Sequence, residues 1–125
     1  MARTAEQRQH IREWVAALRS GEFQQGYGWL RRQPIHGDPF YCCLGVACEL
    51  YRRENPGTTW ENIEGGLGWG YKALDGTTCF WDLPPIVSMY YGVPHTHSLM
   101  VLNDVSLLSF SDIADAIERE YLAGA

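Results

Sequence analysis

The feature that most constrains the fold is an amphipathic helix at each end of the chain. The first is expected over residues 4–21, where Thr4 and Gln7 form a capping box and Gly21 ends the helix. Its apolar residues recur with the spacing i, i+3, i+4 and i+7, so they share one helix face. They are Ile11, Trp14, Val15 and Leu18. A helix with one apolar face must pack against other elements, which predicts a core between the two ends.

The second of these helices begins after Ser109, which is the expected N-cap, with Asp112 completing a capping box. Leu108 and Ile113 stand at the positions of a hydrophobic staple. The predicted buried stripe consists of Phe110, Ile113, Ala114, Ile117 and Tyr121. Acidic residues occupy the opposite face, which we therefore expect to be solvated.

A third helix is predicted over residues 42–54, within the segment "YCCLGVACEL". Three of the four cysteines of the chain lie here, and Gly45 and Ala47 are small enough to let another element approach closely. Cysteine is among the residue types most often buried. We therefore expect Cys43 and Cys48 to be core residues, and we leave the role of Cys42 open.

Glycine and aromatic residues alternate over residues 57–81, a pattern typical of a loop or a hairpin. A short helix should follow, capped by Asp82, with Pro84 and Pro85 in its first turn. Residues 98–102, "SLMVL", read as a strand. Together these elements predict a compact α+β fold in which about four helices surround a small antiparallel sheet. Residues 1–125 form a single domain, because no linker or repeat interrupts them.

Composition limits the class of protein. The chain has 125 residues, of which 46% are hydrophobic and 20% charged, as in an ordinary globular domain. No apolar run is long enough to span a membrane, and the N-terminus does not resemble a signal peptide. We therefore expect a cytoplasmic protein with reduced cysteines. A net charge of −5 argues against non-specific binding to nucleic acid.

Charge is unevenly distributed. Residues 1–53 carry eight Arg against five acids, a balance of +3, whereas residues 54–125 carry two bases against ten acids, a balance of −8. A GC-rich genome is one explanation of the many arginines. The other is an anion site in which Arg31, Arg32, Arg52 and Arg53 gather on one face.

The spacing of cysteines and histidines does not predict a metal site. A structural zinc site needs paired ligands at short spacing, and Cys43 and Cys48 are five residues apart, which turns them away from each other on a helix. The pair His95 and His97 is a weak signal by itself. We expect neither a metal nor another cofactor.

A thiol nucleophile is the catalytic alternative. Cys42 or Cys43 stands at a helix N-terminus, where the helix dipole lowers the pKa of a thiol. His95 or His97 could act as the base, with Asn103 as a polar orienting residue. A cysteine followed along the chain by a histidine and a polar orienting residue is the order found in Cys/His thiol hydrolases. We keep this hypothesis as the alternative to cysteines that only pack in the core.

Aromatic residues and arginines near glycines predict a binding surface. Trp and Tyr on loops give a large contact area at low entropic cost, and Arg can hold a phosphate or stack on a ring. Such a surface could stack a base and bind a phosphate. The residues that we predict to make contact are Tyr27, Trp29, Arg31, Arg32, Trp69 and Tyr71.

Four segments resemble a family of small uncharacterised proteins of bacteriophages and prophages. They are "WVAALRSGEFQQGYGWLR", "YCCLGVACEL", "LPPIVSMYYGV" and "VLNDVSLLSFSDIADAIE". The resemblance implies a phage-type accessory protein working in a bacterial cytoplasm, and it assigns no catalytic residue. By analogy with such proteins, the partner would be a host protein or a nucleotide-like signal used in host defence.

The leading hypothesis is therefore a non-enzymatic accessory protein, active in host interaction or against host defence. A Cys/His thiol hydrolase is one alternative. A structural or virion-associated module is the other.

Overall fold

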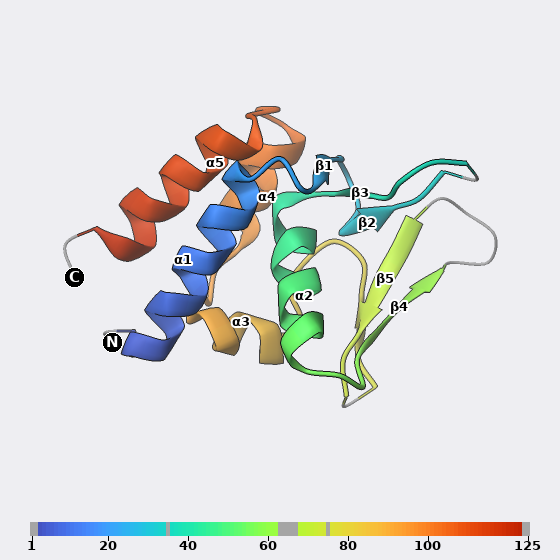
Figure 1. Ribbon diagram of the computed structural model, residues 1–125, viewed down its shortest axis with the longest axis horizontal. Coiled ribbons are helices and arrows are strands. Elements are labelled where there is room, and N and C mark those ends of the chain that lie inside the picture. Colours follow the sequence, from blue (N-terminus) through green and yellow to red (C-terminus); the bar gives the residue numbers. More distant parts are fainter. Residues whose placement is uncertain (1–2, 35, 63–67, 75, 124–125) are drawn as a thin grey trace.

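The structure is a computed structural model that describes residues 3–34, 36–62, 68–74 and 76–123, and it is an α+β domain. Helix α2 (Cys43–Glu54) lies in the middle, with the other helices on one side and the sheet on the other (Figure 1). The other helices are α1 (Ala5–Arg19), α3 (Pro85–Tyr91), α4 (His97–Asp104) and α5 (Phe110–Ile117), which continues into a π-helical segment, η1 (Glu118–Leu122).

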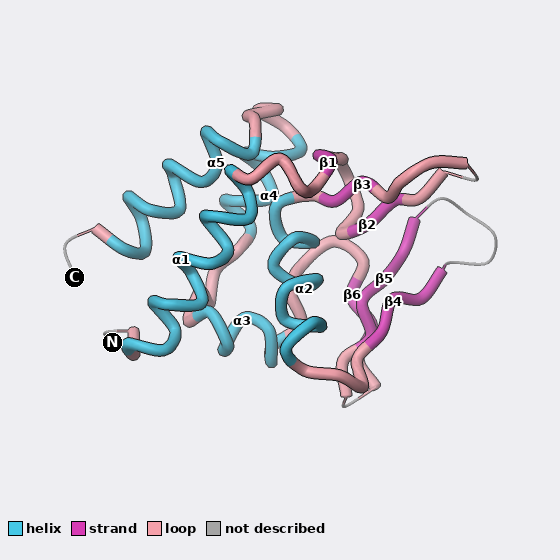
Figure 2. The backbone as a smooth tube through the Cα atoms, in the orientation of Figure 1, coloured by secondary structure: helices cyan, strands magenta, loops and turns pink. Residues whose placement is uncertain are grey.

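The sheet is small and mixed. Its strands are β1 (Gln24–Gln25), β2 (Arg31–Arg32), β3 (Phe40–Tyr41), β4 (Thr59–Asn62), β5 (Gly68–Lys72) and β6 (Thr78–Cys79). The order is β1-β3-β2-β5-β4, with β6 also paired to β5 (Figure 2). All pairs are antiparallel except β1 with β3, which is parallel. The α+β class is confirmed, and the expectation of a purely antiparallel sheet is corrected.

The predicted strand over residues 98–102 is wrong, because this segment belongs to helix α4. A short apolar run does not reveal its period, so a buried helix and a strand look alike in the sequence. Leu99 and Asn103, one helical turn apart, are the buried residues of α4. Within the described residues the α-helices therefore number five, one more than expected.

The helices at the two ends form where the sequence predicts them, but of the expected Ser109–Asp112 capping box the structure shows the Ser109 half. Thr4 and Gln7 make the reciprocal capping box of α1, and Ser109 accepts a hydrogen bond from the Asp112 backbone at the start of α5. All residues of both predicted stripes are buried. Arg19 links the two helices, since its Nη2 contacts Asp115 at 2.5 Å and Glu118 at 2.6 Å.

Helix α2 packs closely against the chain that enters β2. A Cβ atom on Gly45 would lie 1.7 Å from the backbone oxygen of Leu30, so only glycine allows this approach. Cys43 and Cys48 are fully buried, as expected, and Cys42 is 4% exposed. The small residues of "CCLGVAC" thus let α2 occupy the centre of the fold.

Asp82 is not the cap of α3, contrary to expectation. The helix begins at Pro85 after Pro84, and no side chain caps it. Asp82 instead accepts hydrogen bonds from the backbone of Leu83 and the hydroxyl of Thr96. The side chain therefore ties the start of α3 to the start of α4.

In the part of the chain that the structure describes, no helix has both the length and the apolar character needed to cross a membrane.

Candidate functional site

A hollow of about 360 Å³ lies between the sheet and the C-terminal half of α2. We call it the Arg31 hollow. Strand alternation creates it, because successive side chains of a strand point to opposite faces. Arg31 of β2 pairs with Trp69 of β5, and Trp69 pairs in turn with Asn62 of β4. Trp60 lies two residues before Asn62, so its side chain is on the same face of the sheet. The lining residues of the hollow are Arg31, Tyr41, Glu49, Arg52, Thr59, Trp60 and Trp69.

The guanidinium of Arg31 is surrounded by aromatic rings. Its Cζ lies 4.8 Å from the ring centroid of Trp69, 5.6 Å from that of Trp60 and 5.9 Å from that of Tyr41. Nη2 donates to Gln33, whereas Nε is shielded from solvent and has no hydrogen-bond partner. Among the described residues no carboxylate forms an ion pair with Arg31. The rings hold this cation in place and leave its charge uncompensated.

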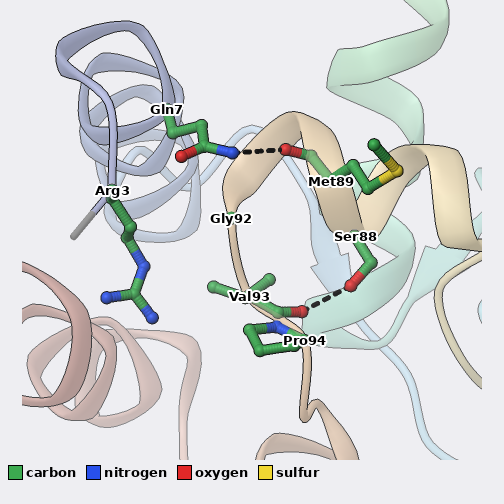
Figure 3. A pocket seen from close by; sticks show the side chains of 7 residues that line it. All are labelled: Arg3, Gln7, Ser88, Met89, Gly92, Val93 and Pro94. Carbon is green, nitrogen blue, oxygen red and sulfur yellow. Dashed lines mark hydrogen bonds between the residues drawn. The ribbon is translucent and has the colours of Figure 1, made fainter. Parts of the chain in front are cut away.

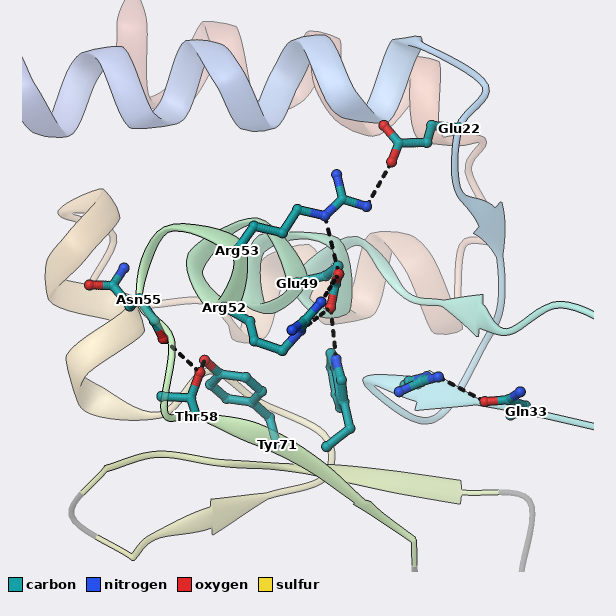
Figure 4. Close-up of polar contacts among 10 residues, drawn as sticks. Glu22, Gln33, Glu49, Arg52, Arg53, Asn55, Thr58 and Tyr71 are labelled. Atoms are coloured by element: carbon teal, nitrogen blue, oxygen red, sulfur yellow. Dashed lines mark hydrogen bonds and ion pairs between the residues drawn. The ribbon is translucent and has the colours of Figure 1, made fainter.

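The carboxylate of Glu49, a residue of α2 that lines the hollow, accepts hydrogen bonds from three side chains. Arg52 donates to both of its oxygens, at 2.8 and 2.7 Å, and Trp60 Nε1 donates at 3.0 Å. Arg53 donates to it at 3.1 Å and also pairs with Glu22 at 2.7 Å (Figure 4). Every one of these donors helps to fix the wall of the hollow.

Burial by itself raises the pKa of Glu49. The hydrogen bonds from Arg52, Trp60 and Arg53 outweigh that effect, so its pKa lies below the usual value and the group is ionised. Its negative charge is already shared between two arginines. Arg31 is the cation that remains without a partner, so the hollow favours an anion, and its rings favour a flat group beside that anion.

The structure separates the six residues that the sequence predicts to make contact. Arg31 and Trp69 meet in the Arg31 hollow. Arg32, the next residue along β2, points to the opposite face and lines a different groove together with Tyr27. Trp29 packs against Phe80 and Trp81.

Tyr71, the sixth predicted residue, is fully buried. Its hydroxyl donates to Thr58 Oγ1 at 2.5 Å, inside the core. The structure therefore offers no surface of Tyr71 for contact with a ligand.

Five residues of the hollow are missing from the six predicted contact residues: Tyr41, Glu49, Arg52, Thr59 and Trp60. Arg52 belongs, however, to the group of arginines that the sequence suggested as an anion site. Arg52 and Glu49 stand three positions apart on α2, a spacing at which opposite charges meet on a helix. That pair was a usable signal. Tyr41 and Trp60 come from separate strands, and only the register of the sheet brings them to Arg31.

The thiols at the start of α2 are poorly placed for catalysis. Burial raises the pKa of Cys42 to about 12 and that of Cys43 well above its usual value. Cys42 Sγ accepts from the backbone of Gly45, and Cys43 Sγ donates to the carbonyl of Leu99. His95 and His97 are exposed. Buried protonated thiols and exposed imidazoles do not make a nucleophile and its base.

Asn103 has a structural role in place of the orienting role that the hydrolase hypothesis gave it. It is fully buried. Its Oδ1 accepts from the backbone of Cys43 and from Gln25, and its Nδ2 donates to Gly26. The side chain joins β1, α2 and α4.

For metal ligation, the described residues contain no group of three or more His, Cys, Asp or Glu side chains that could hold an ion.

The fold and the hollow define a small α+β domain with an arginine held among aromatic rings. Residues 7–97 match the model of a domain of unknown function, DUF8296, and the chain belongs to this family. The match includes every residue that lines the Arg31 hollow and ends before α5. No curated protein and no solved structure matches the chain.

Proposed function

We propose that this protein is a non-enzymatic, phage-type accessory protein that binds a nucleotide-like ligand in the bacterial cytoplasm. The resemblance to phage and prophage proteins supports the biological setting. The Arg31 hollow supports the ligand class. In this proposal the ligand is sequestered, not converted, since the thiols near α2 are buried and protonated.

One observation carries the proposal: the unpaired guanidinium of Arg31 faces a hollow walled by Trp60, Trp69 and Tyr41. A phosphate would supply the negative charge that Arg31 lacks as a partner. A base would stack on Trp69, which is partly exposed, whereas Tyr41 and Trp60 are buried. A hollow of about 360 Å³ falls within the range of small-molecule sites, at its lower end.

A host protein is the second candidate partner, and a different surface favours it. Trp81 is 53% exposed, and its ring centroid lies 5.5 Å from that of Trp29. Exposed tryptophans are common at the energetic centres of protein interfaces. A host protein bound at this surface would not contact the Arg31 hollow, so substitution of Arg31 would leave its binding unchanged.

The test compares two neighbouring arginines. Arg31→Gln removes the cation from the hollow, whereas Arg32→Gln removes an equal charge from the opposite face of the same strand. Thermal shift against mono-, di- and cyclic nucleotides would first identify a ligand. At a hundred times its Kd, such a ligand should stabilise the protein by about 2.7 kcal/mol. Isothermal titration calorimetry would then measure its Kd for the wild type and both variants.

We expect Arg31→Gln to weaken binding at least about tenfold, and Arg32→Gln to leave it nearly unchanged. Equal losses in both variants, or none in either, would show that the hollow is not the site. A flat nucleotide panel would reject a nucleotide-like ligand and move attention to the Trp81 surface. A virion-associated module should instead assemble by itself, which light scattering would detect.

A further inference from the structure

A second hollow lies at the other end of the molecule, between the first turn of α1 and the segment that follows α3. It encloses about 380 Å³. Figure 3 shows the residues that line it: Arg3, Gln7, Ser88, Met89, Gly92, Val93 and Pro94. We call it the Arg3 hollow. It shares no lining residue with the Arg31 hollow.

Arg3 reproduces the features that mark Arg31. Its Cζ lies 4.6 Å from the ring centroid of Tyr121, so an aromatic ring again holds the cation. Its Nε is shielded from solvent without a hydrogen-bond partner. These two Nε atoms are the buried side-chain nitrogens and oxygens without a partner in the described part of the chain. No carboxylate among the described residues forms an ion pair with Arg3.

The other polar side chains of the Arg3 hollow are already satisfied within the protein. Gln7 accepts from the backbone of Thr4 and donates to the carbonyl of Met89 at 2.8 Å. Ser88 donates its hydroxyl to the carbonyl of Val93 at 2.5 Å. Arg3 is therefore the group left to recognise a ligand by charge.

The rest of the lining is apolar. Val93 and Pro94 lie across from Arg3, whereas the side chain of Met89 extends away from it (Figure 3). Pro94 is exposed, so its ring offers apolar surface to a ligand. The Arg3 hollow has no tryptophan in its wall, unlike the Arg31 hollow. Its chemistry is one positive charge beside aliphatic surface.

We infer that the Arg3 hollow binds a small aliphatic carboxylate. The carboxylate would supply the planar pair of acceptors that the terminal Nη1 and Nη2 edge of a guanidinium matches. The hydrocarbon chain would lie against Pro94 and be partly withdrawn from water. A single cation in apolar surroundings compensates one negative charge and disfavours a second.

The test uses hexanoate as the probe and hexanol as a neutral control of equal chain length. Backbone amide shifts of the ¹⁵N-labelled full chain would be followed during titration. We expect saturable shifts at Gln7, Gly92 and Val93 with hexanoate, and a much weaker response to hexanol. Butyrate should bind about fifteenfold more weakly than hexanoate, because each lost CH₂ costs about fourfold in affinity.

Substitutions test whether hexanoate binds through the charge of Arg3 and through the apolar wall of the hollow. Arg3→Gln should weaken the binding of hexanoate at least about tenfold, whereas Arg12→Gln, which changes an exposed arginine of α1, should not. Pro94→Ser should reduce the preference for hexanoate over butyrate while keeping the charge requirement. Identical spectra of the free variants would show that the fold is intact.

Three results would overturn the inference. They are no saturable shift with hexanoate, equal binding of hexanol and hexanoate, and unchanged affinity in Arg3→Gln. None of them bears on nucleotide binding in the Arg31 hollow, which is tested by separate ligands and variants.

Discussion

The two halves of α2 differ in burial and in charge. The N-terminal half, Cys43–Cys48, is fully buried and made of small or aliphatic residues. The C-terminal half carries Glu49, Arg52 and Arg53 and borders the Arg31 hollow. One helix thus provides close packing at one end and placed charge at the other.

Burial determines where the reactive groups of this chain can act. Thiols that look reactive in the sequence lie in the buried half, where desolvation keeps them protonated. In the charged half, hydrogen-bond donors surround the carboxylate of Glu49 and keep it ionised. Arg31, on the other side of the hollow, has no carboxylate partner among the described residues. Function is therefore expected at the polar end, and stability at the buried end.

The largest effect should come from Gly45→Ala in the buried half. Glycine to alanine in a helix normally stabilises it by about 0.5–1 kcal/mol. Here the new Cβ would meet the backbone oxygen of Leu30 at 1.7 Å, so the helix or the strand must move. We expect a loss of about 3 kcal/mol or more, measured by urea unfolding. A stabilised variant would show that α2 does not approach Leu30 this closely.

Glu49→Gln should have the next largest effect, in the charged half. The substitution removes an ionised acceptor from Arg52, Arg53 and Trp60, and leaves these donors partly unsatisfied. We expect a loss of about 2–3 kcal/mol in the free energy of unfolding at neutral pH. A loss under about 0.5 kcal/mol would mean that water replaces Glu49 as the acceptor for Arg52, Arg53 and Trp60.

The pH dependence of that difference tests its electrostatic origin. Because the folded-state pKa of Glu49 is lowered, its contribution is fully present above the unfolded-state value of about 4.3. It is lost as the pH falls through the folded-state pKa. The difference between wild type and Glu49→Gln should therefore shrink below about pH 4. A difference that is constant with pH would point to packing instead of charge.

The smallest effect should be the response of the buried thiols to iodoacetamide at neutral pH. We expect Cys42, Cys43 and Cys48 to stay unmodified in the folded protein over a time in which urea-unfolded protein is fully labelled. Peptide mapping by mass spectrometry would locate any adduct. Rapid modification of Cys42 or Cys43 alone would revive the thiol hydrolase.

Elements whose signals are local can be predicted from the sequence. The capping residues and apolar stripes of α1 and α5 act within a few turns, so they specify those helices wherever the chain folds. The small residues around Gly45 likewise predicted close packing of α2. The α+β class follows from combining such helices with a segment rich in glycine and aromatic residues.

The helical conformation of α4 and the set of residues that line the Arg31 hollow depend on tertiary contacts. The apolar run at residues 98–102 is too short to show a period, and the packing of Leu99 and Asn103 against neighbouring elements selects a helix. Arg31 and Arg32 are equivalent in the sequence, but strand alternation places one in the hollow and the other on the opposite face. Tyr41, Trp60 and Trp69 reach Arg31 through strand register, which depends on contacts between residues far apart in the chain.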